Sequence, residues 1–303
     1  MSLRNGLAGL VAALLPLAAG AASSTAPQPP PAVLFENVRI FDGTSARLSA
    51  PSNVLVVGNL IQSVSSQAIA PPTGAAVTRI PGGGRTLMPG LIDNHVHIAL
   101  STTSQADLLS PATTAEVLQA RATAEAGDML MRGFTSVRDM GGPLLTARPA
   151  IDKGELPGPR IYASGAMISQ TSGHGDSRLP QERSRRFFGE VSKGEQLGAN
   201  YIADGRDEVL TATRENLRAG ATQIKVMAGG GAASAYDPLD VTQYTLDEMK
   251  AAVEAASDWN TYVTVHAYTP RAVRRAVEAG VLCIEHGQLL DEDTMKLLAD
   301  KGI

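Results

Sequence analysis

The sequence predicts an α/β fold of parallel strands, arranged as a TIM-type (β/α)8 barrel or as a doubly wound sheet. From residue 88 onward, helical segments end at glycines and apolar, strand-like runs follow them, a rhythm typical of βαβ units. Polar residues able to bind metal stand at the ends of several of these runs. In a barrel the carboxyl ends of the strands meet at one rim, where the chemistry takes place. We therefore expect a barrel, preceded by a small β-sandwich module.

The first 22 residues resemble a secretory signal peptide. Arg4 precedes an apolar run over residues 7–22, and small residues around positions 19–22 offer a cleavage site. The run is short and rich in alanine and glycine, which argues against a membrane span. A Pro-rich linker is expected over residues 23–32. These features predict a periplasmic or secreted protein that has no membrane segment once the signal is removed.

Residues 33–87 are expected to form the small β module. A strand is predicted over residues 33–41, and residues 53–64 read as a hairpin that turns at Gly58-Asn59. Three consecutive glycines at 82–84 then break the pattern. The module carries no obvious chemistry of its own.

Residues 88–303 are expected to form the barrel. Thr113 and Thr245 each precede a glutamate by three residues, as in capping boxes, and Pro270 suits the first position of a helix. A further helix is predicted over residues 211–219. A closed barrel would need two more βα units beyond residue 303, so we expect an incomplete barrel with about six of its eight strands. These strands are predicted near Leu91, Phe134, Arg160, Gln223, Tyr262 and Leu282.

Composition excludes several classes of function. The formal net charge is −4, aromatic residues make up 4% of the chain, and there is no basic run, so nucleic-acid binding is not expected. The single cysteine, Cys283, excludes an intrachain disulfide and a Cys-rich zinc site, and we expect a buried, inert thiol. Gly229–Gly231 has no P-loop lysine, and Ser172 and Ser234 lack the context of a nucleophile elbow.

The most informative stretch contains two histidines separated by one residue. His95 and His97 follow an apolar run, and residues i and i+2 of a strand share a face roughly 6.5–7 Å apart. Two imidazoles buried on one face either share a metal or need other hydrogen-bond partners. The pair alone leaves both interpretations open.

Three further residues would join this pair at the rim of a barrel. His266 and His286 end predicted strands, and Lys225 lies inside an apolar strand. A buried lysine must reach solvent, pair with a carboxylate or lose its charge. As a neutral amine it can take up carbon dioxide and become a carbamate, which offers two oxygens to metal ions. An ion pair across the barrel is the alternative.

The ordered set of motifs resembles the amidohydrolase superfamily, and more closely its Xaa-Pro dipeptidase and imidazolonepropionase-like branch. The resemblance extends from about residue 33 to the end of the sequence. It is carried by Leu-Met-Pro-Gly-Leu-Ile-Asp-Asn-His95-Val-His97, Thr135-Ser-Val-Arg-Asp139-Met-Gly-Gly, Thr171-Ser-Gly-His174-Gly-Asp176, Lys225, Val-His266-Ala-Tyr and Ile-Glu-His286-Gly.

The resemblance implies a binuclear centre of divalent metal ions, usually zinc. By position, His95 and His97 would hold the more buried metal, carbamylated Lys225 would bridge, and His266 and His286 would hold the exposed one. A metal-bridging hydroxide would attack the scissile carbonyl. The family also uses an aspartate at the end of strand eight to move the proton. That position falls beyond residue 303, which leaves an inactive metal-binding fragment as one interpretation.

The resemblance also points to residues near the substrate. His174, between two glycines, would hydrogen-bond the carbonyl or the developing oxyanion. Tyr236, Tyr268 and Arg271 are candidates for holding a substrate carboxylate, with helix capping or packing as their alternatives. Asp93 shares a face with His95 and is expected to orient its imidazole.

Together these observations predict a metal-dependent hydrolase of amide bonds, most simply a dipeptidase or carboxypeptidase acting on small molecules or short peptides. A detoxifying amidohydrolase that opens a lactone or cleaves an amide such as ochratoxin is the alternative in the same fold. The branch implied by the resemblance commonly forms homo-oligomers, so a second copy of the chain is an expected partner.

Overall fold

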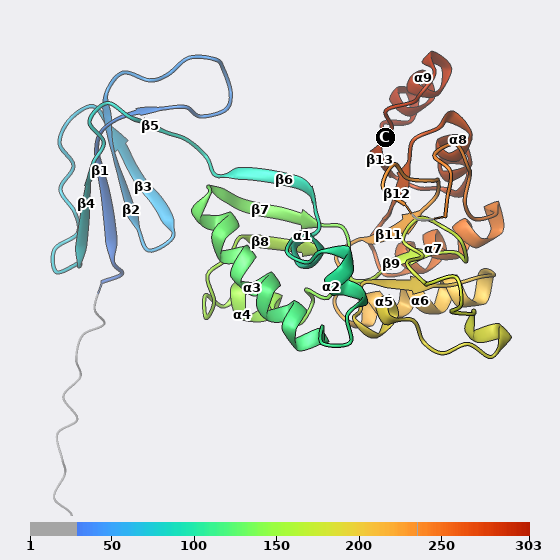
Figure 1. Cartoon of the computed structure of the whole chain (residues 1–303). Helices are drawn as coiled ribbons and strands as arrows, with labels where there is room; N and C mark the ends of the chain where they lie inside the picture. Colours follow the sequence, from blue (N-terminus) through green and yellow to red (C-terminus); the bar gives the residue numbers. More distant parts are fainter. Residues whose placement is uncertain (1–28, 235) are drawn as a thin grey trace, which may run out of the picture. The chain divides into compact units, whose positions relative to one another are not determined.

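The computed structural model describes residues 29–234 and 236–303, and the chain divides into two compact units (Figure 1). The first unit ends at Pro89 and the second begins at Gly90, two residues after the predicted boundary. The predicted signal peptide and most of the predicted linker lie outside the described residues. Ala32, placed in the linker by the sequence, is instead the first residue of a strand.

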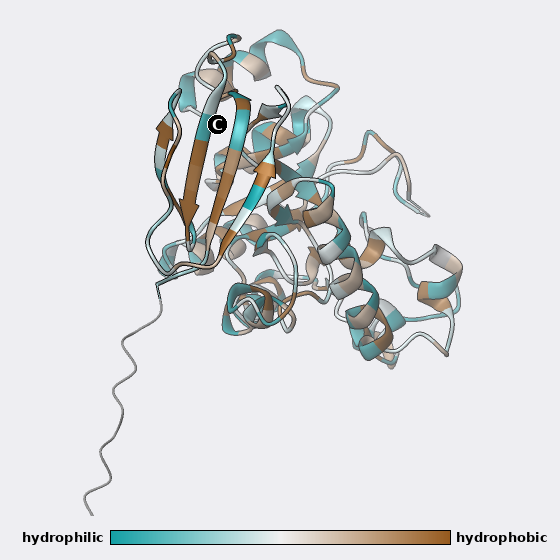
Figure 2. Cartoon of the chain, turned by 90° about the vertical axis from the view of Figure 1, so that its left-hand side faces the viewer, coloured by the Kyte–Doolittle hydropathy of each residue, from teal (hydrophilic) through white to brown (hydrophobic). Residues whose placement is uncertain are grey.

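The first unit contains one five-stranded sheet with the order β3-β2-β1-β4, and β5 also pairs with β1. The predicted hairpin is formed by β2 and β3, with Gly58 at φ 59° in the turn. Figure 2 shows hydrophobic residues along these strands, and Ala32, Leu34 and Leu55 form a small core. A sandwich requires a second sheet, and the described residues of this unit contribute one, so the sandwich is not confirmed. The strands are β1 (Ala32–Ile40), β2 (Ser52–Val57), β3 (Leu60–Ser65), β4 (Val77–Pro81) and β5 (Thr86–Leu87).

The second unit has the predicted α/β architecture, with parallel strands in two sheets ordered β6-β7-β8 and β10-β9-β11-β12-β13. The N–H of Thr222 donates to the carbonyl of Ala163 at 2.9 Å, which places the start of β11 beside the end of β8. The strands are β6 (Leu91–Val96), β7 (Phe134–Asp139), β8 (Arg160–Ala163), β9 (Met167–Ser169), β10 (Asn200–Ile202), β11 (Ile224–Met227), β12 (Val263–Ala267) and β13 (Cys283–His286). All the predicted strands are present, whereas β9 and β10 were not predicted.

Helices follow the strands along the chain. They are α1 (Ile98–Ser101), α2 (Gln105–Leu109), α3 (Ala115–Met131), α4 (Arg148–Asp152), the 3-10 helix η1 (Arg185–Phe187), α5 (Lys193–Gln196), α6 (Arg206–Arg218), α7 (Leu246–Asp258), α8 (Pro270–Ala279) and α9 (Glu292–Lys301). The capping box at Thr245 is confirmed. For α3 the prediction is wrong by one residue, because the Thr114 side chain, not that of Thr113, accepts the N-terminal N–H. Helix α6 begins five residues earlier than predicted, after Gly205.

Side-chain alternation divides β11 and β12 into two faces. Ile224 and Val226 pack in one hydrophobic core with Val263 and Val265, together with buried residues of α6, α7 and α8. Lys225 and His266 occupy alternate positions along the same strands, so they face away from these helices. A second core joins α3 and α4 to β7 and β8, and Figure 1 shows both helices on one side of those strands. The helices therefore cover the outer faces and leave the inner faces to polar residues.

Within the described residues, no helix combines the length and the apolar character that a membrane crossing requires.

The capping box of α7 provides a test of this local structure. Thr245→Ala removes the side chain that accepts the N–H of Glu248, so the free energy of unfolding should fall by about 1 kcal/mol in urea titrations. Thr211→Ala in α6 is a matched control, because the exposed Thr211 hydroxyl bonds only to a carbonyl of its own helix. The control should change stability by less than about 0.5 kcal/mol. Equal losses in the two variants would contradict a capping role.

Candidate functional site

All five histidines of the chain gather on the inner faces of the second unit. His95 comes from β6, His97 follows that strand directly, and His174 lies in the loop after β9. His266 and His286 come from β12 and β13. Ring centroids lie 5.3 Å apart for His95–His97, 4.8 Å for His95–His286, 4.6 Å for His266–His286 and 4.0 Å for His174–His266. Residues separated by as many as 191 positions in sequence thus form one cluster.

The first pair is held by contacts at the end of β6. His97 Nδ1 lies 3.2 Å from the carbonyl oxygen of Gly141, so the hydrogen bond to this carbonyl involves Nδ1 and not Nε2. Gly141 has φ 151°, and a Cβ there would lie 2.3 Å from Cγ of Met167. A residue with a side chain therefore cannot bring this carbonyl to the imidazole without displacing Met167.

His174 and His266 form a stacked pair. Their rings are inclined by 18°, and His266 Nε2 lies 3.0 Å from the carbonyl oxygen of Gly230. A Cβ on Gly231 would lie 2.0 Å from Cε1 of His174, so glycine is required for the loop to pass this ring. His174 Nδ1 also faces a carboxylate oxygen of Asp237 at 3.5 Å.

Lys225 is buried on the same inner faces, with 1% of its surface exposed. Burial lowers the pKa of its amine to about 8, although the charge of Glu285 opposes this shift. Within the described chain, no carboxylate lies within salt-bridge distance of its Nζ. The ion pair weighed as an alternative is therefore not formed, and the neutral amine is accessible near neutral pH.

Three of the imidazoles, those of His97, His266 and His286, are neutral near pH 7. Burial is the largest cause for each, lowering the pKa of His97 to about 4, that of His266 to about 2 and that of His286 to about 4. Burial also lowers the pKa of His174, and Asp237 opposes the shift. A neutral imidazole keeps one lone pair for a metal ion or a hydrogen-bond donor.

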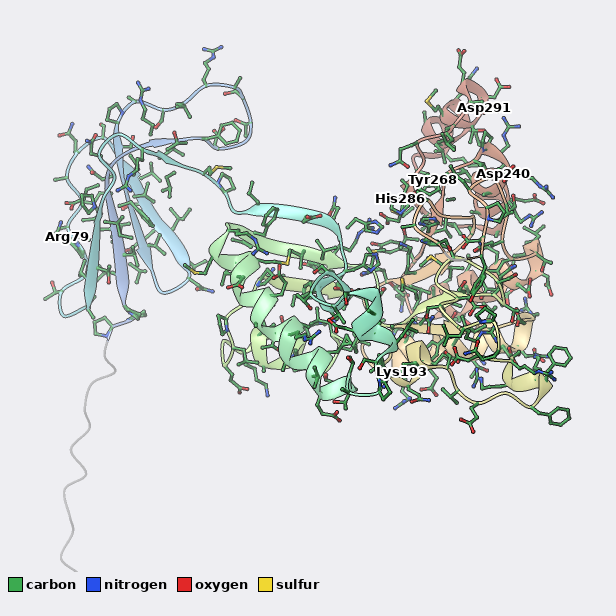
Figure 3. The ribbon with its side chains drawn as sticks, viewed as in Figure 1. Arg79, Lys193, Asp240, Tyr268, His286 and Asp291 are labelled. Carbon is green, nitrogen blue, oxygen red and sulfur yellow. The ribbon has the colours of Figure 1, made fainter. Side chains whose placement is uncertain are left out.

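Tyr268 is the predicted substrate residue that contacts the histidines. Figure 3 labels it beside His286, and the two rings stack at 5.2 Å. The Tyr236 hydroxyl instead donates to the carbonyl of Arg178 at 2.5 Å, and Arg271 is exposed at the start of α8. Among the described contacts, neither Tyr236 nor Arg271 reaches a histidine by hydrogen bond, ion pair or ring contact.

The structure corrects which carboxylate faces His95. Asp93 accepts the backbone N–H of His95 at 3.0 Å and not its ring. The imidazole Nδ1 lies 2.7 Å from Glu285, a residue that the sequence analysis missed. The available signal was an acidic residue next to His286 in an otherwise apolar run.

Asp139 supports the site through the backbone. It is fully buried and accepts the N–H groups of Ile98 and Gly141 at 2.8 and 3.1 Å. Burial raises its pKa to about 7, although both hydrogen bonds oppose the shift. This carboxylate therefore ties the end of β7 to the segment that follows His97.

The residue types at the site are ones that bind divalent metal ions, but their side chains are not oriented around a common metal position. Neutral imidazoles and a buried amine are groups that zinc-type ions bind, the amine after conversion to a carbamate. Ring nitrogens of His95, His97 and His266 are engaged with Glu285, Gly141 and Gly230. Within the described residues, no three His, Cys, Asp or Glu side chains form a ready-made metal cluster. Metal binding at this site would require rotation of at least some of these rings.

Comparison with known proteins agrees with the geometry. The amidohydrolase family model matches residues 86–303. Ochratoxinase from Aspergillus niger is 34% identical over 267 residues, which cover 86% of this chain and 55% of that protein. The chain thus spans about half the length of the curated relatives that it matches.

Two solved structures are also similar to this chain. A prolidase in complex with N-methylphosphonate-L-proline has a TM-score of 0.79 and 38% identity, covering 89% of this chain and 64% of that one. A Xaa-Pro dipeptidase with methionine bound in its active site has a TM-score of 0.73 and 30% identity, covering 89% and 65%.

The low pKa of His266 predicts a dependence of stability on pH. Between about 2 and 6.5 the unfolded chain binds a proton at this ring and the folded chain does not, so stability falls as the pH drops below 6.5. In metal-free His266→Gln, the slope of unfolding free energy against pH between pH 6.5 and 5 should decrease by up to about 1.4 kcal/mol per pH unit.

Urea unfolding at a series of pH values measures this slope. Measurements above pH 8 are the internal control, since the ring is neutral there in both states and the slopes of the two proteins should agree. Equal slopes below pH 6.5 would contradict the pKa shift. The raised pKa of Asp139 changes the slope in the opposite direction, but this contribution is present in both proteins and cancels in the difference between their slopes.

Proposed function

Because the chain belongs to the amidohydrolase family, we propose that it hydrolyses amide bonds with two divalent metal ions, most simply zinc. The observation that carries the proposal is the gathering of four imidazoles around the inner faces that also bury Lys225. In this proposal His95, His97, His266 and His286 would hold the metal ions, and Lys225, as a carbamate, would supply a ligand shared between them.

The buried lysine is suited to carbamate formation. Its neutral amine attacks the carbon of carbon dioxide, a nitrogen–carbon bond forms, and one proton leaves to solvent. The product carries one negative charge and two oxygens, which compensate the charge of bound cations. The lowered pKa of Lys225 favours the amine that this step requires.

When bound, the metal ions would polarise the scissile carbonyl and activate water. The remaining tasks fall to residues of this chain. We assign to His174 a hydrogen bond to the carbonyl or to the developing oxyanion, since its ring stacks on His266. Tyr268 is the best-placed substrate contact, and Tyr236 and Arg271 would reach a substrate carboxylate after movement of their side chains or loops.

We favour a dipeptidase or carboxypeptidase acting on short N-substituted amino acids. The support is the similarity to a prolidase and a Xaa-Pro dipeptidase, each at 30% identity or more. The second candidate is hydrolysis of an ochratoxin-like amide or of a lactone, favoured by the 34% identity to ochratoxinase. Export to a periplasm or medium and assembly into homo-oligomers complete the proposal.

Turnover and metal content separate these functions from one another and from a chain that only binds metal. The chain loaded with Zn²⁺ should hydrolyse members of a panel of Xaa-Pro dipeptides, N-acyl amino acids and ochratoxin, and a chelator should abolish the activity. Readdition of Zn²⁺ is the control for irreversible damage. Bound metal without turnover on any panel member would favour the binding-only alternative, and turnover that survives chelation would refute metal dependence.

Removal of the proposed bridge tests the metal centre directly. Lys225→Ala should reduce binding from about two metal ions per chain to one or none, because neither a carbamate nor its charge can form. Elemental analysis after dialysis and calorimetric titration with Zn²⁺ measure the stoichiometry. The matched control is Lys250→Ala, which removes an exposed lysine from α7 and should keep the wild-type value. Retention of two metals by the Lys225 variant would refute the bridging role.

A further inference from the structure

Glu285 is the centre of a buried polar network beneath the histidines. One carboxylate oxygen lies 2.7 Å from His95 Nδ1. The other accepts from Arg138 Nη2 and from the Thr264 hydroxyl, each at 2.5 Å. The Glu285 side chain is 6% exposed, so protein groups rather than solvent satisfy both oxygens.

Arg138 is itself held in place by three elements. Its Nε donates to the carbonyl of Asn94 at 2.7 Å, and its Nη1 lies 3.2 Å from the Tyr262 hydroxyl and 3.4 Å from Cys283 Sγ. The guanidinium thus links β7 to β6, to β13 and to Tyr262, the residue that precedes β12. A carboxylate fixed by this guanidinium has little freedom to leave the histidine.

The backbone explains how Glu285 and His286 both contact the histidine cluster although they are neighbours. Successive side chains of a regular strand point to opposite faces. His286 has φ 77°, a left-handed conformation that ends β13, and the N–H of Gly287 donates to Ala267 at 3.0 Å. The change in direction at the strand end therefore brings His286 to the cluster beside Glu285.

We propose that Glu285 is a positioning residue for His95. Its carboxylate accepts a hydrogen bond from Nδ1–H, which selects that tautomer and leaves the Nε2 lone pair free for a metal ion. Arg138 and Thr264 hold the carboxylate in the orientation that this requires. In metalloproteins, the ring nitrogen of a ligand histidine that does not bind the metal commonly donates its N–H to a carboxylate. Loss of that carboxylate weakens metal binding. The part of this inference that concerns metal affinity rests on the proposed function.

The competing interpretation is a purely structural ion pair between Arg138 and Glu285. That role would require neither a particular tautomer of His95 nor a change in metal affinity on conservative substitution. The tautomer can be measured without metal, because histidine-selective ¹⁵N labelling gives only five imidazoles and His95→Gln assigns the relevant signals.

The experiment uses the full chain in three steps. NMR of the metal-free protein, at a pH where the His95 ring is neutral, should show its proton on Nδ1. Glu285→Gln, which removes the charge but keeps the side-chain shape, should lose this tautomer preference and bind Zn²⁺ about 10–100-fold more weakly. Thr264→Val removes one hydrogen bond to Glu285 and should weaken Zn²⁺ binding less.

Glu195→Gln is the matched control. Glu195 is also a 6% exposed carboxylate paired with an arginine, Arg185, but it caps α5 and makes no polar contact with a histidine among the described residues. It should leave the His95 tautomer and the Zn²⁺ affinity unchanged.

Two results would overturn the proposal: a metal-free His95 protonated at Nε2, or folded Glu285→Gln with wild-type Zn²⁺ affinity. If the glutamine variant does not fold, the tautomer of the wild-type protein and the Zn²⁺ affinity of Thr264→Val decide. A wild-type chain that binds no divalent metal would refute the proposed function, and the His95 tautomer would still decide the role of Glu285.

Discussion

The second unit is constrained above all by the burial of an amine and several imidazoles on the inner faces of its strands. An ionised ammonium at Lys225 would lose its hydration without a carboxylate in contact, which is costly in a protein interior. Burial lowers the pKa of Lys225, His97 and His266, and this shift favours the uncharged form of each group. The result is a concentrated set of nitrogen lone pairs, of which those of Lys225 and His266 are shielded from solvent.

This arrangement depends on helices that pack closely on the outer faces. The buried positions of α7 and α8 are largely alanines, including Ala251, Ala252, Ala272 and Ala276. Small side chains allow these helices to approach β11 and β12, where they cover Ile224, Val226, Val263 and Val265. The apolar side chains of these strands face the helices. Because side chains alternate along a strand, the polar ones lie together on the inner face. The same alternation thus supplies the core and the site.

Short sequence patterns were sufficient to predict the strands that carry Lys225 and the histidines, and the start of α7. A lysine between apolar residues, histidines at strand ends and the Thr-x-x-Glu box at Thr245 each depend on neighbours in sequence, and each of these residues lies at the predicted element. The short strands β9 and β10 have three residues each and no usable periodicity. The contact between His95 and Glu285 joins residues 190 positions apart, so the nearer Asp93 was the carboxylate that sequence spacing favoured.

The ends of the strands determine which atoms face the cluster, and here the backbone departs from regular geometry. Gly141 brings a carbonyl to His97 through a φ that suits glycine, and His286 accepts a left-handed conformation that is unusual for a residue with a side chain. Such strain costs about 1–3 kcal/mol and persists only when surrounding contacts enforce it. At His286 those contacts are the stacked ring of Tyr268 and the packing against His95 and His266. Strain retained at a position that adds an imidazole to the cluster is more readily explained by a functional role than by the stability of the sheet.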